Sequence, residues 1–159
     1  MKKLSIAVLL FLSLGVLFTS CDKNSGLEGT EQTENENVGV HKIVVTTSGN
    51  EEATYMAFFW GFGESDEKEL YDVNGERVGL AYQKRGNIGE SFTCYTEKET
   101  HQLDFSLSIM YVGVEETQIS YTIDCFINDK KIDSVTKNIK FKGLASGQTV
   151  ESFEISTKK

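Results

Sequence analysis

Hydrophobic and polar residues alternate with a period of two in two segments of the chain. In LDFSLSIMYV, every second residue from Leu103 to Tyr111 is apolar, with Asp104 and two serines between them. In QISYTIDCFIN, every second residue from Ile119 to Ile127 is apolar or a cysteine. Successive side chains of a strand point to opposite faces, so each segment would bury one face and expose the other. Both segments are therefore predicted to be half-buried antiparallel strands.

Other segments extend this pattern into a larger β structure. The further strand candidates are HKIVVTT from His41, ATYMAFFWGF from Ala53, SFTCYTE, KIDSVTKNIKF and TVESFEIST. The sequence D-x-N-G at Asp72 to Gly75 predicts a hairpin turn, and so does NDKK at Asn128 to Lys131, because Asn, Asp and Gly tolerate positive φ. Seven or eight strands with short turns and no convincing helix predict an all-β fold, an antiparallel β-sandwich that is immunoglobulin-like or similar.

One strand is predicted to lie at a sheet edge. In KIDSVTKNIKF the alternation is weak, with Ile132, Ser134 and Thr136 on one face before Ile139 and Phe141. Lysines along the segment would discourage pairing with another chain, as edge strands require.

The first 20 residues are typical of a secretory signal peptide. Lys2 and Lys3 precede an uncharged apolar run from Ile6 to Phe18, which is shorter than the roughly 20 residues needed to span a bilayer. The small residues that follow lead directly to Cys21. This ending resembles the lipobox of bacterial lipoproteins in a relaxed form, with Phe18 where that family usually has leucine. The resemblance implies lipid attachment at Cys21; the alternative is an ordinary signal peptide.

Three regions follow from this assignment: a signal peptide at 1–20, a disordered acidic tether at 21–39 and a sandwich domain at 40–159. The tether is rich in Glu, Asn, Thr and Gly and has little to bury. Its acidic residues after Cys21 resemble the export signals of surface lipoproteins in some Gram-negative anaerobes, although a plain solvated spacer has the same composition. We expect an exported protein anchored by lipid to the outer membrane, with the cell surface favoured over the periplasmic face.

The negative charge of the chain limits the classes of molecule that it is expected to bind. The chain has a formal net charge of −8, and its short basic clusters do not form a basic face, so nucleic acid is not an expected partner. The expected partners are the membrane, through the N-terminal lipid, and an unknown protein or glycan. The block ISYTIDCFINDKKIDSVT also resembles the second half of small accessory β-sandwich proteins of mycobacterial membranes, which implies the same sandwich fold.

Cys94 and Cys125 each lie on the face that their strand is predicted to bury. An exported compartment permits a disulfide between them, and two buried thiols acting as small hydrophobes are the alternative. The absence of C-x-x-C makes a redox role improbable in either case.

No motif for catalysis occurs in the sequence. There is no G-x-S-x-G, P-loop or H-E-x-x-H, and His41 and His101 are expected at the surface without metal-ligand spacing. The acidic run GESDEKELYD could offer oxygen ligands to calcium, but it lacks the EF-hand spacing, and solvated loop carboxylates are the preferred interpretation. We therefore predict no catalytic residues, no metal and no cofactor.

Aromatic residues between positions 55 and 62 are the remaining feature. Alternation places Tyr55 on one face of its strand and Trp60 with Phe62 on the other. Rings displayed at the surface would mark a binding site, whereas a strand covered on both sides, the preferred interpretation, would display none. Tyr55, Trp60 and Phe62 are the candidate ligand contacts of a non-catalytic binding or adhesion module. The alternatives are a periplasm-facing accessory subunit of an envelope complex, an inhibitor or a small enzyme.

Overall fold

The computed structural model describes residues 37–144 and 149–158. The predicted signal peptide, Cys21 and the predicted tether up to residue 36 lie outside the described residues. The described chain forms eleven β-strands and no helix. The strands are β1 His41–Gly49, β2 Thr54–Phe62, β3 Glu67–Lys68, β4 Leu70–Asp72, β5 Arg77–Gly79, β6 Ala81–Asn87, β7 Ser91–Thr96, β8 Gln102–Tyr111, β9 Thr117–Ile127, β10 Lys130–Phe141 and β11 Thr149–Ser156.

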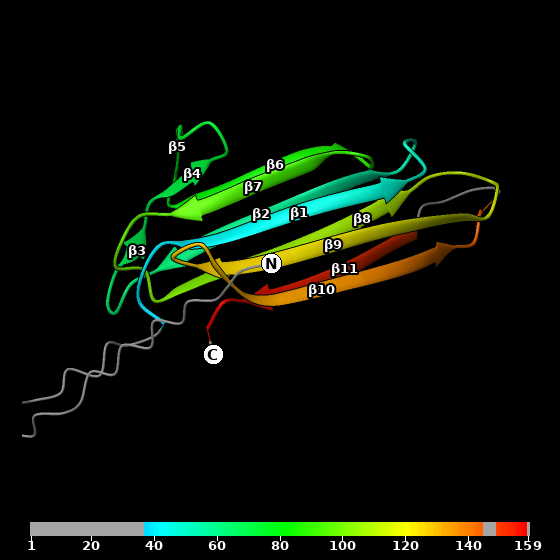
Figure 1. The fold of residues 1–159 in the computed structure, drawn as a ribbon. Helices are drawn as coiled ribbons and strands as arrows, with labels where there is room; N and C mark the ends of the chain where they lie inside the picture. The colour runs from blue at the N-terminus through cyan, green and yellow to red at the C-terminus, as the bar shows by residue number, and fades with distance from the viewer. Residues whose placement is uncertain (1–36, 145–148, 159) are drawn as a thin grey trace, which may run out of the picture. The chain divides into compact units, whose positions relative to one another are not determined.

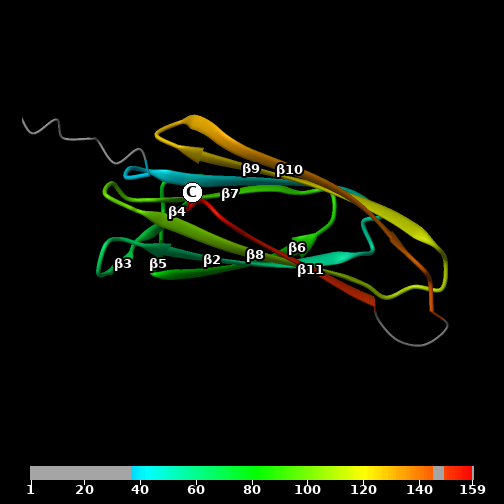
Figure 2. The same cartoon turned by 90° about the horizontal axis from the view of Figure 1, so that it is seen from below.

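The strands form two antiparallel sheets that pack face to face, so the predicted β-sandwich is confirmed. The first sheet has the order β10-β9-β1-β7-β4-β5. The second has the order β11-β8-β2-β3, and β6 pairs with β2 on the same side as β3. Figures 1 and 2 show β9, β1 and β7 in one layer and β2 and β8 in the other.

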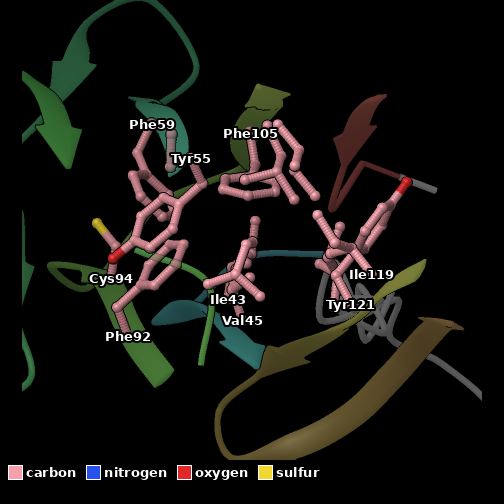
Figure 3. Packing of buried hydrophobic residues seen from close by; sticks show 14 of the residues in the cluster. Ile43, Val45, Tyr55, Phe59, Phe92, Cys94, Phe105, Ile119 and Tyr121 are labelled. Carbon is pink, nitrogen blue, oxygen red and sulfur yellow. The ribbon is translucent and has the colours of Figure 1, made fainter. Parts of the chain in front are cut away.

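The core lies between these layers and follows from the alternation in the sequence. Every second residue of β8 from Leu103 to Tyr111 is buried, and so is every second residue of β9 from Ile119 to Ile127. Figure 3 shows Tyr55, Phe59 and Phe105 of the second sheet facing Ile43 and other residues of the first. The centroids of the Phe59 and Phe105 rings are 4.8 Å apart. Burial of these side chains is the main source of stability, at about 25 cal/mol per Å² of apolar surface.

The strand count exceeds the predicted seven or eight because the segment between β2 and β7 forms four short or polar strands. Two of them form the predicted hairpin at Asp72 to Gly75, where Leu70 pairs with Gly79 and Gly75 has φ of 80°. Asp72 Oδ1 accepts hydrogen bonds from the backbone N–H groups of Asn74, at 2.9 Å, and Glu76, at 3.0 Å. The aspartate therefore stabilises the turn through its side chain, as Asx-turns do.

The turn between β9 and β10 and the position of β10 also agree with the sequence. Asn128 and Asp129 have φ of 49° and 62°, the left-handed conformation of a two-residue hairpin turn. β10 lies at the edge of the first sheet, as predicted. None of the described segments is a helix with the length and hydropathy needed to cross a bilayer.

The proposed disulfide between Cys94 and Cys125 is not formed, and both thiols are free and buried. Cys94 of β7 and Cys125 of β9 both pair with Ile43 of β1, from opposite sides. Two interstrand spacings separate them, roughly 9.5 Å. A disulfide requires Cα atoms within about 7 Å, so the strand between them prevents the bond. The alternative interpretation, two thiols that act as small hydrophobes, describes the structure.

His41 is fully buried, which corrects the expectation of a surface histidine. Its Nε2 lies 2.8 Å from the carbonyl oxygen of Asn37, and its Nδ1 lies 2.6 Å from Oγ1 of Thr157. Gly39 pairs with Thr100 through two backbone hydrogen bonds. Asn37 and Gly39, which precede position 40, therefore already make tertiary contacts.

Candidate functional site

The face of the second sheet that points away from the core carries the candidate site. We call it the outer face; it consists of the side chains that alternate with the buried ones. Its residues are Thr54, Met56, Phe58, Trp60 and Phe62 of β2; Gln102, Asp104, Ser106, Ser108 and Met110 of β8; Val150, Ser152, Glu154 and Ser156 of β11; and Ala81, Gln83, Arg85 and Asn87 of β6.

Strand register arranges these residues in rows across the sheet. Trp60 lies opposite Asp104, and Asp104 lies opposite Ser156. In the next row Phe58 lies opposite Ser106, which lies opposite Glu154. Residues on one strand that are two apart face the same way, so the rows stack into columns along the strands.

The column on β2 is apolar and aromatic. Trp60 is 37% exposed, although tryptophan is usually well buried. Its ring is nearly parallel to that of Phe58, with 10° between the planes and 5.8 Å between the centroids. The rings remain partly exposed because the strands on either side of this column present small or polar side chains.

A shallow hollow lies beside Trp60 because the neighbouring strand carries small residues. Ser106 of β8 and Ser156 of β11 cannot fill the space between Trp60 and Glu154. The hollow has a volume of about 450 Å³, which is within the usual range for small-molecule sites. Its lining residues are Trp60, Gln102, Asp104, Phe105, Ser106, Glu154, Ile155 and Ser156.

The polar groups of this hollow are mainly hydrogen-bond acceptors. The side-chain amide of Gln102 donates to both carboxylate oxygens of Asp104, at 2.7 and 2.8 Å. That arrangement fixes the orientation of the Asp104 carboxylate and leaves the remaining lone pairs of its oxygens available. Glu154 is exposed on the opposite side, and the lining contains no lysine, arginine or histidine.

A second hollow lies further along the same face and is more apolar. Its volume is about 710 Å³. It is lined by Thr54, Tyr55, Met56, Arg85, Gly86, Asn87, Ser108, Met110 and Val150. Ser108 again provides the space, and it interacts with Ser152 at 3.1 Å between the hydroxyl oxygens. The two hollows lie one after the other along the outer-face residues of β8, and we call Ser106 and Ser108, which lie between them, the serine column.

The solvent face of the first sheet has the opposite character. There Thr122 lies between Thr46 and Thr136, and its hydroxyl is 3.0 Å from that of Thr136. Phe126, a large apolar residue on this face, has the ammonium groups of Lys42 and Lys131 over its ring at 4.8 and 5.7 Å. Among the described residues, β1, β7, β9 and β10 expose no large hydrophobic side chain. Polar side chains on this face are bonded to one another, whereas the outer face of the second sheet displays rings and hollows.

The structure separates the three residues proposed as ligand contacts. Trp60 and Phe62 lie on the outer face, in the same column of β2. Tyr55 lines the second hollow but points into the core and is only 2% exposed, so its ring is not a ligand contact of the outer face. Its hydroxyl donates to Glu90 at 2.8 Å, and burial together with this bond raises the pKa of Tyr55. The ring stacks on Phe92 with centroids 4.6 Å apart, so Tyr55 is a core residue.

Gln102, Asp104, Ser106 and Glu154 were not identified as site residues from the sequence. Their polar positions in alternating strands were the only signal, and that pattern is shared by any solvent-facing strand. Only the pairing of β8 with both β2 and β11 brings them beside Trp60.

The acidic segment proposed as a calcium alternative is engaged in local contacts. Asp66 pairs with Lys68 at 3.1 Å, Glu69 pairs with Arg77, and Asp72 binds the backbone of its own turn. In residues 37–144 and 149–158, no group of three His, Cys, Asp or Glu side chains could hold a metal ion.

Comparison with known proteins found no matching family model and no matching curated protein. Three solved structures are similar. A DUF4425 family protein from Bacteroides ovatus is 27% identical, with a TM-score of 0.69 over 77% of this chain and 98% of that one. A domain of unknown function, DUF4425, from Bacteroides vulgatus is 23% identical, with a TM-score of 0.68 over the same shares.

The third structure is the calcium-bound form of a protein from Parabacteroides distasonis. It is 14% identical, with a TM-score of 0.51 over 79% of this chain and 99% of that one. None of the three comes from a mycobacterium, so they lend no support to the resemblance to mycobacterial accessory proteins. Residues 37–144 and 149–158 thus have the β-sandwich fold seen in DUF4425 proteins, whose function is unknown.

Proposed function

We propose that this protein is a lipid-anchored, non-catalytic binding module of the outer membrane, displayed at the cell surface, and that it holds its ligand on the outer face of the second sheet. The observation that carries the proposal is the exposed Trp60 beside a hollow of about 450 Å³ on the second sheet. The Trp60 ring stacks with Phe58 beside this hollow, and exposed apolar patches commonly mark interaction sites.

Anchoring is supported by the sequence at the N-terminus. The lipobox-like ending at Cys21 and the acidic, polar stretch after it provide an attachment point and a spacer. One acyl chain binds membranes only marginally, whereas two or more hold firmly, at about 0.8 kcal/mol per buried CH₂.

Each hollow of the outer face remains open to solvent beside strands that no other described segment covers.

The role of Trp60 is tested by ligand retention. Full-length wild type and Trp60→Ala, purified in detergent, would be immobilised and exposed to the soluble proteins and polysaccharides of the growth medium. We expect Trp60→Ala to lose the ligand that the wild type retains. Val114→Ala is the control, since Val114 is 70% exposed but lies outside the outer face. Equal retention by Trp60→Ala, with an unchanged melting temperature, would exclude Trp60 as a contact.

Location is tested by protease treatment of intact cells. The domain should be digested in wild-type cells while a periplasmic marker survives, and Cys21→Ser should be released from the membrane. Protection of the domain would instead favour a periplasm-facing accessory subunit. A Cys21→Ser variant that is cleaved from its signal and still fractionates with the membrane would contradict the lipid anchor.

A further inference from the structure

We infer that the ligand of the outer face is a neutral oligosaccharide, bound with one sugar ring against Trp60. The inference rests on the proposed function and adds the chemical class of the ligand. It follows from the combination of an exposed ring, a hollow of fixed shape and hydrogen-bonding groups of a particular kind.

The shape of the hollow beside Trp60 is set by three neighbouring strands. Trp60 borders the hollow on one side and Glu154 on the other, with Ser106 between their strands. The walls come from neighbouring strands of one sheet, so the hollow is held by backbone hydrogen bonds and not by a loop. Such a preformed, shallow site costs little ordering on binding and suits a flat ligand.

The hydrogen-bonding groups of this hollow match those of a sugar. The polar side chains of the lining are two carboxylates, an amide and serine hydroxyls. Carboxylates only accept hydrogen bonds, whereas serine hydroxyls both donate and accept. Sugar hydroxyls also do both, so they can satisfy every one of these groups. The axial C–H groups of a pyranose ring provide the apolar surface that matches an indole ring.

The charge of the hollow beside Trp60 favours a neutral ligand. Asp104 and Glu154 would repel an anionic ligand beside Trp60, and no cation lines that hollow; Arg85 lines only the second hollow, in the row of Met56 and Ser108. A cationic peptide would gain little from Glu154, because exposed ion pairs contribute weakly. Asp104 already accepts two hydrogen bonds from Gln102, so it does not require a cation. A neutral, hydroxyl-rich ligand fits the lining better than either charged class.

The outer face has room for a ligand longer than one sugar ring. The serine column of β8 continues from Ser106 to Ser108 and connects the polar hollow with the second one. Positions two residues apart are separated by roughly 6.8 Å along a strand. A ligand longer than one sugar ring can therefore follow the column, and affinity should increase from a monosaccharide to an oligosaccharide.

The protein contains a single tryptophan, so the fluorescence of Trp60 reports directly on this site. The full-length protein in detergent would be titrated with cellohexaose, maltohexaose and mannohexaose, and with glucose and mannose for comparison. Hexagalacturonate and hexaarginine would test the charged classes. We expect a saturable change with at least one neutral hexasaccharide, and binding about tenfold or more tighter than that of its monosaccharide, which corresponds to 1.4 kcal/mol.

An obstructing variant locates the binding. Ser106→Phe places a large ring in the hollow while keeping Trp60, and it should abolish the change in fluorescence. Thr122→Phe is the matched control, because Thr122 holds the corresponding central place on the solvent face of the first sheet. Unchanged binding by Ser106→Phe, with both variants folded, would overturn the inference.

The outcomes separate this inference from the proposed function. Saturable binding of hexaarginine or hexagalacturonate, without a response to any neutral sugar, would overturn the inference and leave the binding face in place. No response to any probe also overturns the inference, while the retention experiment with Trp60→Ala decides the proposed function independently.

Discussion

At the scale of single residues, His41 connects the two ends of the described domain. Asn37 precedes β1 and Thr157 follows β11, and both contact the His41 ring. A carbonyl oxygen can only accept, so Nε2 donates to Asn37 and the neutral Nδ1 accepts from the hydroxyl of Thr157. That hydroxyl oxygen also accepts the backbone N–H of Leu103, at 2.8 Å. Burial lowers the pKa of His41, since the charged imidazole would lose its hydration, and the nearby His101 acts in the same direction.

Stability should consequently decrease as the pH falls through the normal histidine range. The unfolded chain takes up a proton near pH 6.5, the ordinary value, while folded His41 stays neutral to a lower pH. The unfolded state then binds more protons, so the free energy of unfolding is greatest above pH 6.5 and falls below it. Urea titrations between pH 7.5 and 5.5 measure this slope.

His41→Phe is the matched variant for that measurement. It should lose the part of the slope due to His41 and also lose about 1–3 kcal/mol of stability at pH 7.5, because Thr157 and Asn37 lose a buried partner. A slope identical to that of the wild type would show that other groups cause the pH dependence.

The two core cysteines should behave as protected thiols. Burial is the main cause that raises the pKa of Cys94 to about 12 and that of Cys125 to about 11. Both are therefore protonated and poorly nucleophilic in the folded protein. Maleimide at pH 8 should label them slowly in the native state and completely after unfolding without reductant. Peptide mass analysis that found them linked to each other would contradict the strand order β7-β1-β9.

At the scale of elements, alternation predicted the strands that bury one face and missed those that do not. Strand β6, AYQKRGN, was not expected because its inward residues, Tyr82, Lys84 and Gly86, are only half-buried. It has no apolar period, and its place in the sheet comes from pairing with β2. Strands of this kind are determined by their neighbours and not by their own composition.

The weak alternation in β10 has a structural cause. The pairing of β10 with β9 shifts by one residue between Lys131 and Asp133. After this bulge the inward positions include Val135, Ile139 and Phe141, whereas the sequence interpretation had grouped Ser134 and Thr136 with Ile132. A bulge moves every later side chain to the opposite face. No residue in this segment is of a type that would have predicted the bulge.

The turn between β9 and β10 offers a direct test of backbone conformation. Asp129 has φ of 62°, and its side chain is 88% exposed in an ion pair with Lys42. Asp129→Gly should leave stability unchanged or slightly higher, since glycine favours this φ and exposed ion pairs contribute little. Asp129→Val should cost about 1–2 kcal/mol, because a branched residue is strained there. Thermal melts of the two variants would reveal the difference; equal melting temperatures would argue against a left-handed Asp129.

At the scale of the whole molecule, the sequence was sufficient for the sandwich but not for the candidate site. Trp60 and Phe62 could be placed on one side of β2 from their spacing alone. Tyr55 was grouped with them because a strand with apolar residues on both sides does not reveal which side faces the core. The hollow could not be predicted, since Glu154 of β11 lies 48 residues after Ser106 of β8, its partner in the sheet.

The two solvent faces of the sandwich give the molecule its functional asymmetry. The first carries polar side chains such as the Thr122–Thr136 pair and lysines over its Phe126 ring, and the second carries two stacked rings beside a hollow. This difference is the basis for placing the ligand on the second sheet, and it can be tested without knowing the ligand.

The most direct measurement compares Ser106→Phe with Thr122→Phe in the ligand-retention experiment, using full-length protein with matched melting temperatures. Each variant adds one phenylalanine at the centre of a sheet's solvent face, between two neighbouring strands. We expect Ser106→Phe to lose the ligand retained by the wild type and Thr122→Phe to keep it. Retention by Ser106→Phe together with loss by Thr122→Phe would place the ligand on the first sheet and contradict a binding site on the outer face.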